Sequence, residues 1–478
     1  MEKTIKNLSK KASRYSSLVK TQKDFFKTGK TLDVNFRIKA LISLKDKIKK
    51  NEKLVLEALK TDLDRAPYES FLIEISIVYN ELNYHINNLK KWASDKKVKT
   101  PLTLKPAKSY IHHDPYGTVL ILSPWNYPFQ LCIMPLIGAI SAGNTAIIKP
   151  SHSTPKTSQI IEKIILESFD ERYVAVVNGS VSTASELLKE KYDFIFFTGS
   201  KRVGKIILES ARENLCPVVL ELGGKSPVII DETANIKMAA KRIAFGKVVN
   251  AGQTCVAPDY ALVHESVYRE FVDRYKKSVN SFFPFFKRKE LSKMTKIIND
   301  YHFNRLKNLL TTSNVIFGGK CNEEKRKIYP ALTYEGDIRR YVHYRDDLPA
   351  IMQEEIFGPI LPIITYTDIN DCIEFINDGD KPLALYLYTT NNSKEKKIVS
   401  SCLYGSGCIN DNMTHLSNEN LPFGGVGTSG MGKYHGKYSF ETFSHQKSIM
   451  KNVNYFDINL KYLPYNKIKF EILKKFFK

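Results

Sequence analysis

Three residues of this chain could together carry out nucleophilic chemistry on a carbonyl group. Cys255 lies in VVNAGQTCVAPDY, Asn126 in LILSPWNYP and Glu221 in VVLELGGKSP. A thiolate can attack a carbonyl carbon, an amide can donate a hydrogen bond to the resulting oxyanion, and a carboxylate can later activate water. This set of residue types favours covalent catalysis, provided that the fold brings the three side chains together.

Two of these residues also have an ordinary structural interpretation. A free cysteine packs as a small hydrophobic residue, so Cys255 could simply be buried. Glu221 follows an apolar strand, where a carboxylate needs either a lysine partner or a function, because burying an unpaired charge is costly. In the functional interpretation, burial raises the pKa of Glu221 and makes it a general base. The residues alone leave these alternatives open.

A second group of residues could bind an anionic ligand. Lys149 ends the segment AIIKPS, and FTGSKRVG carries a Gly199–Ser200 turn that opens a predicted helix. Small residues at a helix N-terminus can present backbone N–H groups and the positive end of the helix dipole to a pyrophosphate. Because the segment lacks the full GxGxxG spacing, a simple turn is the alternative.

The elements that would position these residues alternate between strands and helices from residue 117 onward. Short apolar strands are predicted at GTVLILSP, TAIIKP, YVAVV, DFIFFTGS and PVVLELGG, with amphipathic or apolar helices between them. This pattern predicts a parallel sheet covered on both faces, and such sheets bind ligands at the carboxyl ends of their strands. Asn126, Lys149, the Gly199–Ser200 turn and Glu221 lie at or just after those ends.

The first hundred residues are predicted to be helical, and the segment after them is not. Ile75, Tyr79, Leu82, Ile86 and Leu89 recur at spacings of four and three, which is typical of one apolar helix face. Segment 96–117 breaks this pattern with alternating β-prone residues and prolines. We therefore expect an edge strand or an arm that leaves the helical layer.

The composition is that of a globular protein with a strong basic bias. The 478 residues are 43% hydrophobic and 11% aromatic, which is enough for a large core and two or three domains. Lys and Arg total 72 against 50 Asp and Glu, a net charge of +22. Because the lysines are spread along the whole chain, we interpret this charge as a general lysine bias rather than a nucleic-acid or membrane patch.

The cysteines and the N-terminus predict a cytoplasmic protein. Seven cysteines without CxxC pairs or regular spacing favour a reducing compartment. The basic N-terminal segment lacks the apolar core of a signal peptide, and no run approaches the roughly 18 apolar residues of a membrane span.

Seven motifs occur in order along the chain: PWNYP, KPS, FTGS, ELGGKSP, GQTC, EEIFGP and LPFGGVGTSGMGKYHGKYSFETFSHQK. In these motifs the sequence resembles the aldehyde dehydrogenase superfamily over nearly its whole length. GQTCVAPDY and GMGKYHGKYSFETFSHQK are similar to the class 3 branch, which includes enzymes acting on fatty and aromatic aldehydes. The resemblance implies NAD(P)-dependent oxidation of medium-chain, long-chain or aromatic aldehydes to carboxylic acids.

The resemblance also implies a role for each motif residue. Cys255 is the expected nucleophile, which forms a thiohemiacetal and then a thioester, Asn126 the side-chain donor of the oxyanion hole, and Glu221 the general base. The expected NAD(P) contacts are Lys149 and Glu355 at the two riboses with Phe357 nearby, Gly199, Ser200, Val203 and Gly204 at the pyrophosphate or adenine, and Phe423 at the nicotinamide. No metal ligand is expected.

One position departs from the family pattern and bears on the choice of cofactor. The family commonly has an acidic residue three positions after the cofactor lysine, where it can bind the ribose 2′-hydroxyl, whereas KPSHSTP has His152 there. A carboxylate would repel the 2′-phosphate of NADP and a histidine would not. We therefore expect the enzyme to accept NADP as well as NAD.

The implied α/β architecture has a Rossmann-like cofactor domain, an α/β catalytic domain and a small β oligomerisation arm. The expected division places the NAD(P)-binding domain at 1–95 and 117–222, the catalytic domain at 223–444, and the arm and C-terminal tail at 96–116 and 445–478. Class 3 relatives are typically dimers, and pairing would protect an exposed strand edge, so we expect a homodimer.

The C-terminal segment YNKIKFEILKKFFK places Tyr465, Ile468, Ile472 and Phe476 at helical spacing with lysines between them. Some class 3 relatives carry a hydrophobic membrane anchor at this end, but this tail is shorter and charged. It could make a weak contact with an anionic membrane surface, or dock on its own domain or a partner subunit. We favour docking.

Two rival functions remain for the same sequence. An acyl-CoA-forming or phosphorylating aldehyde dehydrogenase would pass the thioester to another acceptor, but a water-activating Glu221 is unhelpful to that reaction. A basic nucleic-acid-binding protein on an inactive enzyme fold would account for the charge of +22. We expect no nucleic-acid partner, because aromatic and basic residues do not cluster together.

Overall fold

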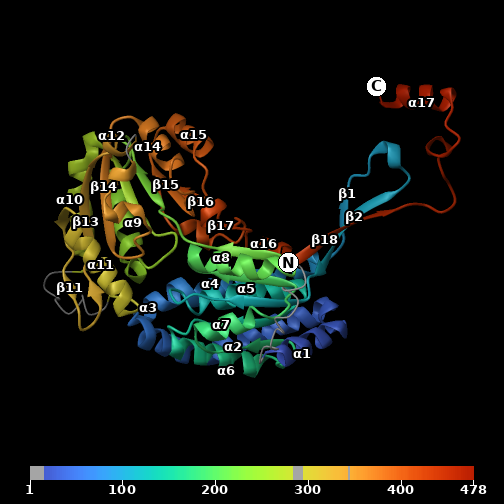
Figure 1. Cartoon of the computed structure of the whole chain (residues 1–478), viewed down its shortest axis with the longest axis horizontal. Coiled ribbons are helices and arrows are strands. Elements are labelled where there is room, and N and C mark those ends of the chain that lie inside the picture. Colours follow the sequence, from blue (N-terminus) through green and yellow to red (C-terminus); the bar gives the residue numbers. More distant parts are fainter. Residues whose placement is uncertain (1–14, 284–293, 343–344, 478) are drawn as a thin grey trace, which may run out of the picture.

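The computed structural model describes residues 15–283, 294–342 and 345–477. It contains two lobes, from which an arm projects (Figure 1). The strands predicted after residue 117 form one sheet with the order β17-β7-β6-β3-β4-β5. Its strands are β3 (Thr118–Leu122), β4 (Thr145–Lys149), β5 (Val174–Val176), β6 (Phe194–Thr198), β7 (Val218–Glu221) and β17 (Gly430–Met431).

The order of the strands creates a ligand-binding edge in this first sheet. All neighbours pair in parallel except β17, which runs antiparallel to β7. The chain proceeds from β3 outward to β5 and then returns to β6 on the other side of β3. A parallel sheet that reverses its strand order in this way opens a crevice at the carboxyl ends of the central strands.

Helices cover both faces of the first sheet, as the apolar strands predict. Val119 and Ile121 of β3 pack into one core with α5, while Leu120 and Leu122 pack into another with α8, because successive strand residues point to opposite faces. All thirteen residues of α5 are buried. The helices of this lobe are α1 (Ser16–Lys27), α2 (Val34–Leu63), α3 (Pro67–Ser70), α4 (Ser76–Trp92), α5 (Gln130–Ala142), α6 (Pro155–Ser168), α7 (Val181–Leu187), α8 (Lys201–Arg212) and α16 (Lys437–Thr442).

The second lobe is built on a seven-stranded sheet with the order β10-β13-β14-β9-β8-β15-β16. Its strands are β8 (Pro227–Ile230), β9 (Tyr260–His264), β10 (Val315–Phe317), β13 (Ala331–Asp337), β14 (Ile360–Tyr366), β15 (Ala384–Tyr388) and β16 (Ser406–Ile409). Its helices are α9 (Ile236–Val248), α10 (Tyr268–Phe282), α11 (Asp300–Thr312), α12 (Arg339–Val342), α13 (Ala350–Gln353), α14 (Ile369–Asn377) and α15 (Asn392–Ser401), and β11 (Cys321–Asn322) pairs with β12 (Lys327–Ile328).

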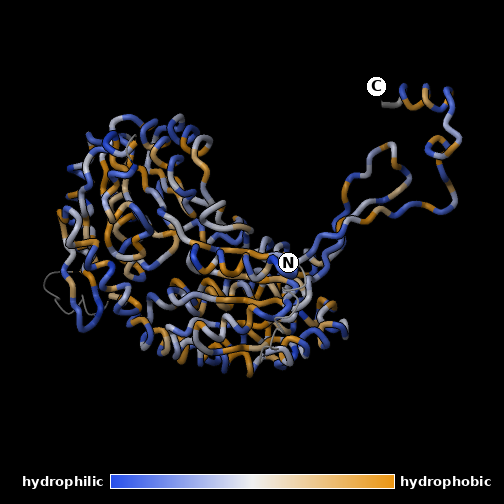
Figure 2. The backbone as a smooth tube through the Cα atoms, viewed as in Figure 1, coloured by the Kyte–Doolittle hydropathy of each residue, from blue (hydrophilic) through white to orange (hydrophobic). Residues whose placement is uncertain are grey.

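The segment after the N-terminal helices forms the arm that its prolines and alternation predict. Strands β1 (Lys96–Val98), β2 (Lys108–Pro115) and β18 (Ser444–Lys451) make an antiparallel sheet. This sheet projects from the body, and the tail helix α17 (Lys467–Phe477) lies beyond it, away from both lobes (Figure 1). Figure 2 shows that apolar segments run through the two lobes, whereas the arm and tail alternate between apolar and polar residues.

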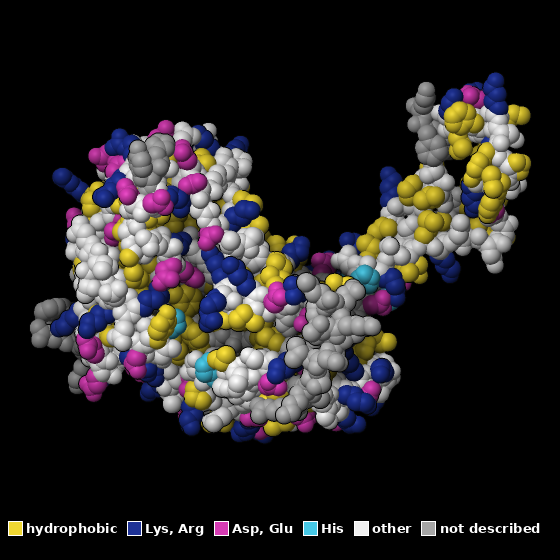
Figure 3. Space-filling model, viewed as in Figure 1, with side chains coloured by type: hydrophobic (Ala, Val, Ile, Leu, Met, Phe, Trp, Pro, Cys, Tyr) yellow, Lys and Arg dark blue, Asp and Glu magenta, His cyan; other side chains and the backbone are white. Residues whose placement is uncertain are grey.

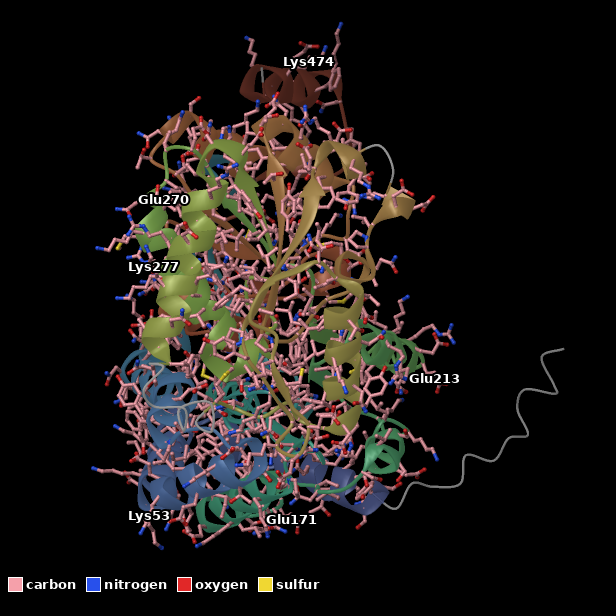
Figure 4. All side chains as sticks on the ribbon, turned by 90° about the vertical axis from the view of Figure 1, so that its left-hand side faces the viewer. Lys53, Glu171, Glu213, Glu270, Lys277 and Lys474 are labelled. Atoms are coloured by element: carbon pink, nitrogen blue, oxygen red, sulfur yellow. The ribbon has the colours of Figure 1, made fainter. Side chains whose placement is uncertain are left out.

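The charged side chains are dispersed over the surface. In Figure 4 the labelled residues Lys53, Glu171 and Lys474 extend outward from different parts of the chain, and Glu270 and Lys277 extend outward from α10. The charged side chains of the described residues are therefore distributed over the body and the tail. This distribution agrees with a general lysine bias.

Candidate active site

The carboxyl ends of β3, β4, β6 and β7 open into a cavity of about 1020 Å³ between the two lobes. Cys255, Asn126 and Glu221 all line this cavity, although they come from three separate segments of the chain. Figure 3 shows the hollow between the lobes, with basic and histidine side chains near its rim. The fold thus brings together the three residues that the sequence singles out.

Cys255 follows a backbone turn in the left-handed conformation. Helix α9 ends at Val248, and Asn250, Ala251 and Gly252 have φ of 52°, 52° and 70°. At Gly252 an added Cβ would lie 2.4 Å from the backbone oxygen of Gly358, so only glycine fits there. This close approach ties the nucleophile loop to the segment that contains Glu355.

Asn126 lies directly beside the nucleophile loop. Its Nδ2 donates to the backbone oxygen of Gln253 at 3.1 Å, and its own backbone oxygen accepts from Nδ2 of Asn250 at 3.0 Å. Asn126 is 4% exposed. An amide NH2 group has two N–H donors, so one of them can still serve a ligand in the cavity.

Glu221 ends strand β7 and is 2% exposed. Neither carboxyl oxygen has a hydrogen-bond partner among the described residues, so it does not form the lysine salt bridge considered above. Burial raises the pKa of Glu221 well above its ordinary value. A buried carboxyl without a protein partner, facing a cavity, is suited to accept a proton from a bound water molecule.

The Cys255 thiol is a poor nucleophile until it loses its proton. Burial and then the nearby Glu355 and Glu221 carboxylates raise the pKa of Cys255 to about 12, while the backbone N–H groups of Cys255 and Val256 oppose this rise. Cys255, Glu221 and Glu355 all line the same cavity. A base or a bound cation must therefore assist deprotonation at neutral pH.

Most of the residues expected at the cofactor line the same cavity. They are Lys149, His152, Gly199, Ser200, Val203, Glu355 and Phe357. Lys149 is 6% exposed, and its Nζ donates to the backbone oxygens of Pro150 at 3.2 Å and Gly179 at 3.1 Å. The cavity therefore has a cation, a helix N-terminus at Ser200 and apolar walls, which suit a dinucleotide.

Glu355 and Phe357 line the same cavity as the nucleophile. An added Cβ on Gly223 would lie 2.0 Å from Oε2 of Glu355, so this glycine allows the carboxyl to enter the cavity. Burial, together with Asp259, raises the pKa of Glu355 to about 8. The Phe357 ring meets the Trp125 ring edge-on, with 5.4 Å between their centres.

Gly204 and Phe423 lie outside the residues that line the cavity. Gly204 is buried one turn into α8, where an added Cβ would lie 2.9 Å from the Leu222 side chain. Phe423 is 5% exposed and its ring stacks on His435 with centres 5.3 Å apart. Gly204 therefore lies against Leu222, and Phe423 lies against His435.

Sequence reasoning did not identify the buried polar residues that support the site, namely Arg65, Glu74 and Asn250. Arg65 follows α2, and Glu74 lies in the π-helical turn Phe71–Ile75. Nothing in the spacing of the first hundred residues distinguishes these two from surface residues. Asn250 stands in the motif of the nucleophile and could have been questioned there.

Membrane-spanning helices and clusters of metal ligands are two further features relevant to function. Within residues 15–283, 294–342 and 345–477, no helix is long and apolar enough to span a bilayer. The same segments contain no group of three or more His, Cys, Asp or Glu side chains that could hold a metal ion.

Comparison with known proteins agrees with this geometry. Residues 2–449 match the model of the aldehyde dehydrogenase family. The chain is 48% identical over 458 residues to 4,4′-diaponeurosporen-aldehyde dehydrogenase of Staphylococcus aureus (strain NCTC 8325 / PS 47), covering 95% of this chain and 97% of that protein. It is 40% identical to the dimeric NADP-preferring aldehyde dehydrogenase of Mus musculus, covering 92% and 94% of the two chains.

A solved structure shows the same fold. The substrate-bound state of Staphylococcus aureus AldH superposes with a TM-score of 0.91 at 47% identity, covering 97% of this chain and 99% of the other. A family match over most of the chain, a shared fold and a cavity lined by the motif residues lead to one conclusion. The chain belongs to the aldehyde dehydrogenase family and is an NAD(P)-dependent enzyme of that family.

Proposed function

We propose that this enzyme oxidises aldehydes to carboxylic acids with Cys255 as the nucleophile, Asn126 as an oxyanion donor and Glu221 as the base. One observation carries this proposal: three reactive groups line one cavity. They are a half-buried thiol, a buried amide and a buried carboxyl that has no hydrogen-bond partner among the described residues. Each group supplies one part of acyl transfer to water.

The residues would act in sequence. The Cys255 sulfur adds to the aldehyde carbon, and the carbonyl oxygen becomes an oxyanion held by the Asn126 amide and the backbone N–H of Cys255. Losing one such donor typically costs about 3 kcal/mol of barrier. Loss of hydride from the thiohemiacetal leaves a thioester on Cys255. Glu221 then takes a proton from water, and the hydroxide releases the acid.

The cavity residues fit a nicotinamide dinucleotide, whose chemistry when bound is to accept that hydride. Lys149 and Glu355 would hold its riboses, and Phe357 would lie near them. Gly199, Ser200 and Val203 would bind the pyrophosphate or the adenine, because they stand at the N-terminus of α8.

The substrate is an aldehyde, and we propose that it is a long-chain or otherwise apolar one. This follows from the Staphylococcus aureus relative, which is named for 4,4′-diaponeurosporenal. In a panel from acetaldehyde to long-chain and aromatic aldehydes, followed by absorbance of the reduced cofactor, kcat/KM is expected to rise on the order of threefold per added methylene. A maximum at acetaldehyde would refute this substrate class.

The same panel separates the hydrolytic enzyme from its rivals. Carboxylic acid should form at the same rate with and without CoA or phosphate, because Glu221 serves water. Formation of acyl-CoA or acyl phosphate would support the other enzyme type. The nucleic-acid-binding alternative is not favoured, because the family match extends over residues 2–449.

His152 is expected to allow NADP to bind. It lines the cavity, and burial together with Lys149 lowers its pKa, so the ring is neutral near pH 7 and does not repel a 2′-phosphate. His152→Glu should raise the KM for NADP about tenfold, a change of about 1.4 kcal/mol, and leave the KM for NAD nearly unchanged. Steady-state kinetics with both cofactors measure this, and a thousandfold preference for NAD in the unmodified enzyme would contradict it.

We propose that the NAD(P)-binding domain comprises 1–95 and 117–222, the catalytic domain 223–444, and the arm and tail 96–116 and 445–478. Residues 1–14 and 284–293 lie outside the described residues. Two segments require an amendment: β17 pairs with β7, which assigns residues 430–431 to the first sheet, and α16 packs against Gly138 of α5 in the first lobe. The exposed edges of β1 and β18 support a homodimer formed through the arm.

The C-terminal tail has two candidate roles, docking on a partner subunit and contact with a membrane surface. In α17 the side chains of Ile468, Phe470 and Ile472 are exposed, and the helix stands away from both lobes. We propose that a partner subunit covers them. A chain ending before Tyr465 should dimerise more weakly in sedimentation, and neither form should co-sediment with anionic liposomes. Equal dimerisation together with tail-dependent liposome binding would instead favour the membrane.

A further inference from the structure

A buried arginine joins the two loops on which the proposed reaction depends. Arg65 is fully buried, and its Nη2 donates to the backbone oxygen of Asn126 at 2.6 Å and to Oδ1 of Asn250 at 2.5 Å. Asn126 carries the amide proposed for the oxyanion, and Asn250 lies in the turn before Cys255. One guanidinium nitrogen is therefore hydrogen-bonded both to the loop of Asn126 and to the loop that precedes Cys255.

The other end of the guanidinium is fixed by Glu74. Nη1 of Arg65 is hydrogen-bonded to Oε1 of Glu74, which is also fully buried. Oε2 of Glu74 accepts from the backbone N–H groups of Phe129 and Gln130, each at 2.9 Å. These two residues, three and four positions after Asn126, are the N-cap and the first residue of helix α5. Glu74 thus anchors the far end of the oxyanion loop and the arginine together.

The nucleophile loop is fixed in the same way. Nδ2 of Asn250 donates to the backbone oxygens of Asn126 at 3.0 Å and Gln253 at 2.9 Å. The Gln253 side chain in turn donates to the backbone oxygen of Asn250 at 3.0 Å and accepts from the backbone N–H of Ile298 at 3.0 Å. The backbone before Cys255 is thereby held on both sides by buried polar contacts.

We propose that Arg65 is a positioning residue that sets the separation between the Asn126 amide and the Cys255 thiol. The inference rests on the proposed roles of those two residues. Arg65 is not among the residues that line the cavity. The planar fork of arginine can bond Glu74, Asn126 and Asn250 at once, whereas the single ammonium of lysine cannot reproduce this geometry.

The test compares two reactions of the same sulfur. Alkylation of Cys255 by iodoacetamide needs the thiolate but forms no oxyanion, whereas acylation by p-nitrophenyl acetate needs both, and neither reaction needs the cofactor. Arg65→Lys should lower the acylation rate about 100-fold, the effect of a displacement of about 1 Å, and leave the alkylation rate within about twofold. With aldehyde and NAD, kcat should fall to the same extent with little change in the KM for NAD.

Two further variants keep the result decisive. Glu74→Gln preserves the size of the side chain and weakens its hydrogen bond to Arg65. It should therefore also lower the acylation rate more than the alkylation rate, but by a smaller factor than Arg65→Lys. Arg37→Lys is the control, because Arg37 is also buried and donates to the backbone oxygens of Thr31, Leu32 and Ser141, away from the cavity. It should leave both rates unchanged.

The outcomes separate this inference from the proposed function. If Arg65→Lys and Glu74→Gln lose both reactions in parallel, or match Arg37→Lys in both, Arg65 does not position the site. If the unmodified enzyme shows no Cys255-dependent ester cleavage, the proposed catalytic roles fail instead.

Discussion

Replacing Cys255 with alanine is expected to abolish aldehyde oxidation, with kcat lowered about ten-thousandfold or more. The physical reason is that no other thiol lines the cavity, so no covalent intermediate can form. Cofactor binding should persist, because Lys149, Ser200 and Glu355 are untouched. Steady-state kinetics and a direct titration with NAD measure the two properties separately.

Cys321→Ala is the matched control for this experiment. Cys321 is also a half-buried free thiol with a pKa raised by burial, but it lies on β11, away from the cavity. It should retain full activity. Undiminished turnover by Cys255→Ala would remove the basis of the proposed mechanism.

The same sulfur predicts a pH dependence. Because the pKa of Cys255 is raised to about 12 in the cofactor-free protein, the thiolate fraction increases as pH rises. The rate of alkylation by iodoacetamide should therefore increase about tenfold per pH unit from pH 7 to 10, without levelling off. A plateau near the pKa of an ordinary thiol, about 8.5, would show that the surroundings of Cys255 do not disfavour its charge.

The second large effect is expected for Glu221→Gln. This change keeps the shape of the side chain and removes its ability to accept a proton, so hydrolysis of the thioester should slow by about 100- to 10,000-fold. Acylation of Cys255 precedes that step. A rapid burst of reduced cofactor, equal to the number of active sites, should thus remain while the steady-state rate nearly disappears, which stopped-flow absorbance can measure.

The pH dependence of the steady state provides an independent check. Burial raises the pKa of Glu221 well above its ordinary value, and only the deprotonated form is a base, so turnover of the unmodified enzyme should increase with pH. Glu221→Gln should lose that increase. Glu335→Gln is the control, since Glu335 is another buried carboxyl with a raised pKa and an unpartnered oxygen among the described residues, but it lies on β13 in the second sheet. Loss of the burst in Glu221→Gln would contradict a role confined to the second half of the reaction.

The fold was largely predictable from local patterns. Alternating apolar strands and helices from residue 117 predicted the first sheet, and each expected strand from β3 to β7 is present. The prolines and alternation of 96–117 predicted the arm. These features follow from periodicity, since the spacing of apolar residues determines which face of an element is buried. Strand β17 was not predicted, because two residues carry no periodic signal and their pairing joins distant parts of the chain.

The residue types in the motifs by themselves determined which groups could react, namely the Cys255 thiol, the Asn126 amide and the Glu221 carboxyl. Only the tertiary structure decided that they share one cavity and that the buried pair Arg65 and Glu74 contacts the loop of Asn126. The physical reason is that reactivity depends on desolvation and on distances between segments far apart in sequence. The residue type determines which reactions a side chain can undergo. The burial of that side chain and its contacts with distant segments arise only when the sheets and helices pack.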